Sequence, residues 1–219
     1  MGILSILGCK TTHPKNLSEQ LEKIGYFDLI ENKQKKKLVK EKIDIEFKND
    51  ENPYIGKDWF IIPNDDYISS VYNLSEYENK SSTSDFKAFE IWGGGLLSGE
   101  FESTLESAKV VFEKNGLKLY WKDENFQQTK NDINHSIIIN DKPYEVFIGT
   151  LSRDKIGKIT YQYISRLREI LNDVIATQNK NYRVILLTQP ETVNFILLSK
   201  KELEQFKKII ENCKNKIEE

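Results

Sequence analysis

The chain has 219 residues, of which 38% are hydrophobic and 30% are charged. Its 11 glycines and five prolines are too few for a collagen-like or Pro/Gly-rich disordered protein. No run of about 18 apolar residues predicts a membrane-spanning helix. With 32 basic against 34 acidic residues, the net charge of −2 argues against a protein that binds nucleic acid through its overall charge. The composition indicates a globular protein with a core of its own.

The first 15 residues predict a polar tail or tether in front of a single domain that covers residues 16–219. Within this tail, Leu4 to Cys9 is similar to the end of a bacterial lipoprotein signal, where an apolar stretch leads into Gly-Cys. The stretch is short and lacks a basic start, so it would act as a signal only if translation began upstream. We therefore expect a cytoplasmic protein, with lipid anchoring through Cys9 as the alternative.

Two helices are expected at the start of the domain. Asn16 to Glu19 begins the first helix with a capping-box pair, and Gly25 ends it. The second helix covers about Glu31–Glu41, while Lys42–Phe47 fits a helix or a strand. The lysines of the second helix share a face. We interpret this face as solvated rather than as a phosphate site, because arginine, the better phosphate ligand, is nearly absent.

Short elements are expected in the middle of the chain. Trp59–Ile62 and Phe86–Trp92 have the composition of strands. Asp65–Asn73 predicts a brief helix, and the polar stretch Ser75–Asp85 predicts a loop. Gly93-Gly94-Gly95 lacks the spacing of a dinucleotide fingerprint or a P-loop, so we interpret this run as a hinge or bulge.

Longer elements are expected from residue 103 onward. Ser103 to Glu106 is a capping box that begins a helix, and Asn115-Gly116 ends that helix. A strand is expected at Leu117–Trp121. The hairpin that follows has the strands Ser136–Ile139 and Pro143–Ile148.

A helix, a hairpin and a further helix are expected in the last third of the chain. An apolar stripe predicts the longest helix over Lys158–Gln178. A second hairpin joins Arg183–Thr188 to Val193–Leu198, and Ser199 caps a final helix. The fold class expected from this order is α+β, with a largely antiparallel sheet of hairpins packed against about five helices.

Few side chains in the sequence suit metal binding or nucleophilic catalysis. The two cysteines, Cys9 and Cys213, and the two histidines, His13 and His135, do not have the paired spacing of a zinc site. We expect no metal, no cofactor and no disulfide framework. His135 precedes a predicted strand, which suggests a strand-entry residue rather than a general base.

Paired carboxylates give the main enzymatic alternative. Glu100 and Glu102 follow the glycine run and would lie on one side of an extended segment. Two such carboxylates are the acid and base of many glycosidases. The alternative is therefore a carboxylate-dependent hydrolase with a site near Trp92–Glu102.

An acidic stretch gives the leading functional hypothesis. From Asn64 to Glu106 the chain has nine acidic residues against two lysines, a local charge of −7. Tyrosines lie among these acids, and exposed aromatic residues are enriched at protein interfaces. The candidate partner-binding residues are Asp65, Asp66, Tyr72, Glu76, Tyr77 and Glu78.

The expected partner is another protein with a basic surface, not nucleic acid. In its general make-up the chain is similar to bacterial immunity proteins, which neutralise a toxin by covering its active site, although no shared motif carries this likeness. The sequence thus predicts a non-enzymatic protein-binding module of the immunity or inhibitor type, with an acidic, aromatic-bearing surface.

Overall fold

The computed structural model describes residues 17–48, 67–69, 77–79, 82–83, 87–91, 93–151, 155–179, 181–188 and 193–205. Within them the helices are α1 (Leu17–Lys23), α2 (Lys33–Lys48), α3 (Gly93–Ser98), α4 (Phe101–Lys114) and α5 (Ile156–Gln178), and a further helix begins at Lys200. The strands are β1 (Tyr67–Ser69), β2 (Tyr77–Asn79), β3 (Ser82–Thr83), β4 (Ala88–Glu90), β5 (Trp121–Gln128), β6 (Asp132–Ile139), β7 (Lys142–Thr150), β8 (Tyr182–Thr188) and β9 (Val193–Ser199). This mixture confirms the predicted α+β class.

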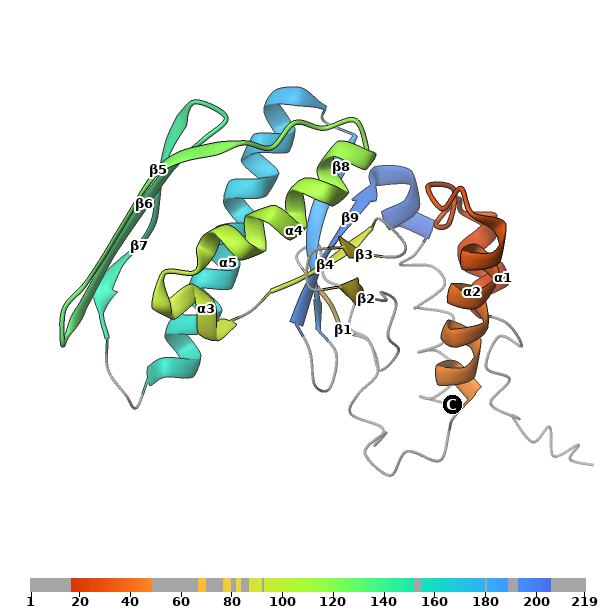
Figure 1. Cartoon of the computed structure of the whole chain (residues 1–219), viewed down its shortest axis with the longest axis horizontal. Helices are drawn as coiled ribbons and strands as arrows, with labels where there is room; N and C mark the ends of the chain where they lie inside the picture. Colours follow the sequence, from red (N-terminus) through yellow and green to blue (C-terminus); the bar gives the residue numbers. More distant parts are fainter. Residues whose placement is uncertain are drawn as a thin grey trace, which may run out of the picture.

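The strands form two larger sheets and one short pair (Figure 1). One sheet has the order β1-β8-β9-β4, in which β1 runs parallel to β8 and the other neighbours are antiparallel. The other is the antiparallel meander β5-β6-β7, and β2 pairs with β3. Asn140 and Asp141 both have positive φ, at 48° and 62°, as the predicted tight turn between β6 and β7 requires.

Helices α4 and α5 lie between the two larger sheets (Figure 1). Helix α5 contacts β8 of one sheet and β7 of the other, so it is buried on more than one face. Its buried residues are Ile159, Tyr163, Ile164, Leu167, Ile170, Leu171, Val174 and Ile175. Helices α1 and α2 pair with each other at the opposite end of the molecule from the three-stranded sheet (Figure 1).

Two short stretches of the middle region are strands where the sequence predicted other structure. Tyr67–Ser69, expected within a helix, forms β1 and pairs with Leu186–Thr188. Tyr77–Asn79 and Ser82–Thr83, expected within a loop, pair as β2 and β3. Both predictions were wrong because pairing with a distant or neighbouring strand overrides weak local preference.

The glycine run forms a helix rather than a hinge or bulge. Leu96 of α3 is fully buried, and α3 packs against α5. Gly99 ends the helix with φ of +84°, and the Glu100 N–H donates to the carbonyl of Gly95 at 2.8 Å, as in a Schellman motif. Tertiary packing of Leu96 therefore outweighs the low helix propensity of glycine.

Helix α4 begins two residues before the predicted capping box. The helix starts at Phe101, whose side chain is fully buried, and Glu100 is the N-cap without a side-chain cap hydrogen bond. The Ser103 hydroxyl donates to the Glu100 carbonyl at 2.9 Å instead of capping a helix of its own. Burial of Phe101 thus fixes the start of the helix, and the Ser103–Glu106 pattern is inside it.

The lysine-rich segment is a helix along its whole length, which resolves Lys42–Phe47 as helical. Asn32 caps α2, because its side-chain oxygen accepts the Lys35 N–H at 3.0 Å. Lys36 and Lys40 approach Glu22 of α1 at 3.4 and 2.6 Å. The hydrogen bond from Lys40 holds the pKa of Glu22 below its ordinary value. Part of the lysine face therefore joins two helices.

A buried ion pair joins β4 to the helix that begins at Lys200. The Lys87 ammonium lies 2.8 Å from Glu202, and only 5% and 10% of these side chains are exposed. Glu202 also accepts the Ser199 N–H at 2.7 Å, and its own N–H donates to the Ser199 hydroxyl at 3.2 Å. This reciprocal pair confirms the predicted cap at Ser199.

Three neighbouring polar side chains attach α5 to both larger sheets. Asn172 accepts the Val184 N–H of β8 and donates to the Val184 carbonyl, both at 2.8 Å. Gln178 makes the same reciprocal pair with Lys118, just before β5, at 2.7 and 2.8 Å. Asp173 accepts hydrogen bonds from Lys142 and Tyr144 of β7, both at 2.6 Å. The end of α5 is therefore fixed on two sides.

We expect Asn172→Ala to lower the free energy of unfolding by about 2 to 3 kcal/mol. The substitution leaves the buried N–H and carbonyl of Val184 without their side-chain partners. Urea denaturation measures the effect, and Gln162→Ala, which removes an exposed amide from the same helix, is the control. Equal stabilities of the two variants would contradict the role given to Asn172.

The stability of the protein should depend on pH through Asp173. Hydrogen bonds from Lys142 and then Tyr144 hold the pKa of Asp173 below its ordinary value. The stabilisation is therefore complete above the unfolded-state pKa of about 3.9 and is lost as the pH falls through the lower folded-state pKa. Asp173→Asn should lose less unfolding free energy than wild type between about pH 5 and pH 2. The loss for Lys142→Met should lie between the losses of the wild type and Asp173→Asn. Parallel plots of unfolding free energy against pH would refute the assignment.

Candidate functional site

A buried histidine occupies the middle of the three-stranded sheet. His135 of β6 has no exposed surface. Its Nδ1 lies 3.1 Å from the Tyr163 hydroxyl of α5, and its Nε2 lies 2.9 Å from a carboxylate oxygen of Glu124 on β5. The prediction of a strand-entry residue was therefore wrong, because β6 begins three residues earlier.

The partners of His135 determine which of its nitrogens carries a proton. Burial, followed by the charge of Glu124, raises the pKa of Tyr163 above its ordinary value, so the hydroxyl keeps its proton and, in the neutral imidazole protonated on Nε2, donates it to Nδ1. The ionised carboxylate of Glu124 only accepts, so Nε2–H donates to it. The result is a directed chain of hydrogen bonds from Tyr163 through His135 to Glu124.

Aromatic rings enclose this chain. Phe101 of α4 and Phe126 of β5 meet the His135 ring edge to face, with centroids 5.0 and 5.2 Å away. Phe147 of β7 stacks on Tyr163 at 4.8 Å and 18°. A Cβ on Gly99 would lie 2.6 Å from Phe126, so glycine at this position lets α3 approach that ring. The rings separate His135 from water.

A bulge in β7 places Phe147 on the inner face. Ser136 pairs with Glu145 and His135 with Phe147, so Val146 is an extra residue on β7. Val146 is buried, and Phe147 reaches Tyr163. Two successive residues therefore face inward, and Ile148 returns to the outside, where 59% of it is exposed.

Next to this cluster, a groove of about 450 Å³ separates β7 from the first half of α5. The strand contributes residues 145–150, and the helix together with its N-cap, Lys155, contributes Lys155, Lys158, Ile159, Gln162 and Arg166. Phe147 belongs both to the groove and to the wall around His135.

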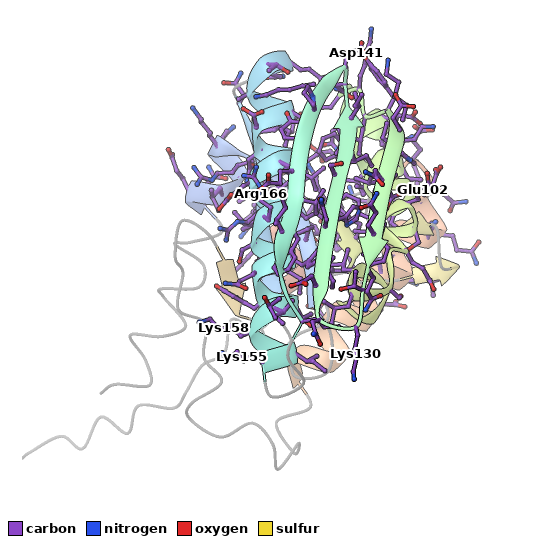
Figure 2. The ribbon with its side chains drawn as sticks, turned by 90° about the vertical axis from the view of Figure 1, so that its left-hand side faces the viewer. Glu102, Lys130, Asp141, Lys155, Lys158 and Arg166 are labelled. Carbon is purple, nitrogen blue, oxygen red and sulfur yellow. The ribbon has the colours of Figure 1, made fainter. Side chains whose placement is uncertain are left out.

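Positive charge dominates the helix side of the groove. Figure 2 shows Lys155, Lys158 and Arg166 along the same helix, beside the edge of the three-stranded sheet. Glu145 is the one carboxylate among the residues that line the groove. Neither lysine forms an ion pair with another residue that the structure describes, so both are available to an acidic ligand.

The strand side of the groove is the edge of a sheet. β7 pairs with β6, and none of the other described strands pairs with its second edge. The Arg166 Nε donates to the Glu145 carbonyl at 3.0 Å, which shows that main-chain groups of this strand face the helix. Arg166 occupies this one carbonyl, and an edge whose other main-chain groups are unpaired can accept another strand.

The predicted partner-binding residues are mostly outside the described part of the chain. Asp65, Asp66, Tyr72 and Glu76 lie outside it. Tyr77 and Glu78 belong to β2, whose backbone alone is described. The acidic surface therefore stays a prediction.

The candidate carboxylates of the hydrolase alternative lie at the surface of the structure. Glu100 and Glu102 are exposed and line neither the groove between β7 and α5 nor the pocket between α1 and α2. They lie at the start of a helix rather than on one side of an extended segment. Among the described residues, no group of three or more His, Cys, Asp or Glu side chains could hold a metal ion.

Sequence patterns alone could have suggested part of this site. Lys155, Lys158, Gln162 and Arg166 follow the three- and four-residue spacing of one helix face, and this stripe was available in the sequence. The pairing of His135 with Glu124 and Tyr163 had no local signal, because it depends on three separate elements.

Comparison with known proteins gives no family for this chain: no protein-family model, curated protein or solved structure matches it. Across the residues that the structure describes, no helix combines the length and apolar character needed to cross a membrane.

Removing the Tyr163 hydroxyl should destabilise the protein. Tyr163→Phe leaves Nδ1 of the fully buried His135 without its donor, so the free energy of unfolding should fall by about 1 to 3 kcal/mol. Thermal or urea denaturation measures this effect. Tyr161→Phe changes a residue of the same helix that is 56% exposed and should have almost no effect. Similar losses of unfolding free energy for both variants would show that the hydrogen-bonded chain does not contribute to stability.

Proposed function

We propose that this protein is a binding module that takes an extended, acidic segment of a partner protein into the groove between β7 and α5. The observation that carries the proposal is that one groove combines an unpaired strand edge with a stripe of cations. A segment in this position would pair with β7 through its main chain and meet the helix with its side chains, as in other strand-addition complexes.

The two walls of the groove match in length. From Glu145 to Thr150, β7 spans about 17 Å at 3.4 Å per residue. From Lys155 to Arg166, α5 rises about 16.5 Å at 1.5 Å per residue. The chain reverses between them, so Thr150 lies near Lys155 and Glu145 near Arg166. The groove therefore accommodates about five or six residues of extended chain.

Charge favours an acidic rather than a basic segment. Lys155, Lys158 and Arg166 oppose a single carboxylate, that of Glu145. The exposed side chain of Ile148, on the outward side of β7, also lines the groove and adds an apolar contact. Charge complementarity of this kind increases the rate of association and discriminates against the wrong partner.

A protein-binding module is also the class predicted from the sequence, but the binding surface proposed here is the groove rather than the acidic stretch. An acidic partner segment in the groove and a basic partner on the stretch Asn64–Glu106 are separate proposals, because they involve separate residues. Residues of the described structure support the groove as a binding site, whereas residue composition supports the acidic stretch.

Three fluorescent peptides test the groove: Thr-Glu-Val-Glu-Val-Glu-Thr and its counterparts with lysine or glutamine in place of glutamate. We expect the acidic peptide to bind at least tenfold more tightly than the lysine peptide, and its affinity to fall as salt screens the charges. Fluorescence anisotropy gives the affinities. Amide NMR shifts should concentrate in residues 145–150 of β7.

Charge reversal supplies the control. Lys155→Glu combined with Lys158→Glu should weaken the acidic peptide by about tenfold or more. Lys118→Glu combined with Lys201→Glu changes the net charge equally at two exposed lysines that do not line the groove. If both pairs weaken binding equally, or if the shifts lie outside β7, the groove is not the binding site.

A further inference from the structure

We infer that the groove selects a segment with acidic residues at positions i and i+4 and a neutral hydrogen-bonding residue at i+2. This inference depends on the proposed function, because it specifies which extended segment the same groove takes. It follows from the spacing of four side chains on α5.

The groove side of α5 presents charges in a fixed order. Measured along the helix axis from Arg166, Gln162 lies about 6 Å away, Lys158 about 12 Å and Lys155 about 16.5 Å. The stripe therefore consists of one cation, one neutral amide and then two cations. Figure 2 shows the three cations along the same side of the helix.

An extended segment presents its side chains to the helix at every second residue. These positions recur about every 6.8 Å, at about 0, 6.8 and 13.6 Å. The first position meets Arg166 and the second meets Gln162. The third falls between Lys158 and Lys155, within the reach of either flexible side chain. An acid at the first and third positions therefore meets a cation, and a hydroxyl or amide at the second meets Gln162.

Arg166 retains N–H donors for such a ligand. Arg166 uses its Nε for the Glu145 carbonyl and one terminal nitrogen for Glu169 at 3.0 Å. A guanidinium has five N–H donors, so others stay available. The predicted pattern is symmetric, so it applies whether the segment runs parallel or antiparallel to β7.

Three peptides of identical composition separate spacing from charge. Thr-Glu-Val-Ser-Val-Glu-Thr carries the acids four residues apart on one face. Thr-Ser-Val-Glu-Val-Glu-Thr carries them two apart on one face, and Thr-Glu-Val-Ser-Glu-Val-Thr carries them three apart on opposite faces. We expect the first to bind at least fivefold more tightly than the other two by fluorescence anisotropy.

A charge swap assigns that preference to α5. In the Lys155→Glu, Lys158→Glu protein, the advantage of the first peptide should disappear. One of the peptides Thr-Lys-Val-Ser-Val-Glu-Thr and Thr-Glu-Val-Ser-Val-Lys-Thr should regain affinity, and which one does so reports the direction of the segment. Circular dichroism checks that the variant, which changes two exposed residues, is folded.

The possible results distinguish this inference from the proposed function. Equal affinities of the three peptides, with amide shifts still in β7, would overturn the spacing rule and leave strand addition in place. Failure of all acidic peptides to bind would overturn both. A preference that persists in the charge-reversed protein would also overturn the spacing rule, because another surface would then be selecting the peptide.

Discussion

The position of α5 depends on main-chain groups that side chains of this helix satisfy. Asn172 and Gln178 each pair with both the N–H and the carbonyl of one residue: Val184 within β8, and Lys118 shortly before β5 of the other sheet. Each amide thereby replaces one residue of a neighbouring strand. Because the pairs are reciprocal, the helix cannot slide along either sheet without leaving polar groups unsatisfied. Asp173 adds a third attachment, to β7.

This attachment at one end of α5 determines what the other end can do. All three anchoring residues lie in the last two turns of α5, which ends at Gln178, whereas the groove is lined by residues up to Arg166. Between them, Tyr163 joins α5 to His135 and stacks on Phe147. The helix is therefore held against β7 behind the groove, and its free flank carries the cations. A preformed site of this kind loses less conformational entropy when it binds a ligand than a flexible one.

The sequence predicts the regular elements better than the contacts between them. The stripe of α5, the turn after Ile139 and the cap at Ser199 are local patterns, and the structure confirms all three, although Lys142, expected in the turn, already belongs to β7. Tyr67–Ser69 and Gly93–Ser98 were predicted wrongly because partners distant in sequence determine their conformation: β8 pairs with the first segment, and α5 packs against the second, in which Leu96 is buried. The same limit applies to the site. The cationic stripe is a local pattern, whereas the strand edge beside it results from sheet topology.

The buried pair of Lys87 and Glu202 connects residues that lie far apart in the chain. Either charge alone in this place would be costly, since an isolated buried ion lacks both water and a counter-charge. During synthesis on the ribosome, β4 emerges long before Glu202 does. The Lys87 ammonium must therefore remain hydrated until the segment that carries Glu202 has also been translated. Docking of β4 against β9 therefore depends on a segment made more than 100 residues later, and the β4 edge of the four-stranded sheet closes only when that segment arrives.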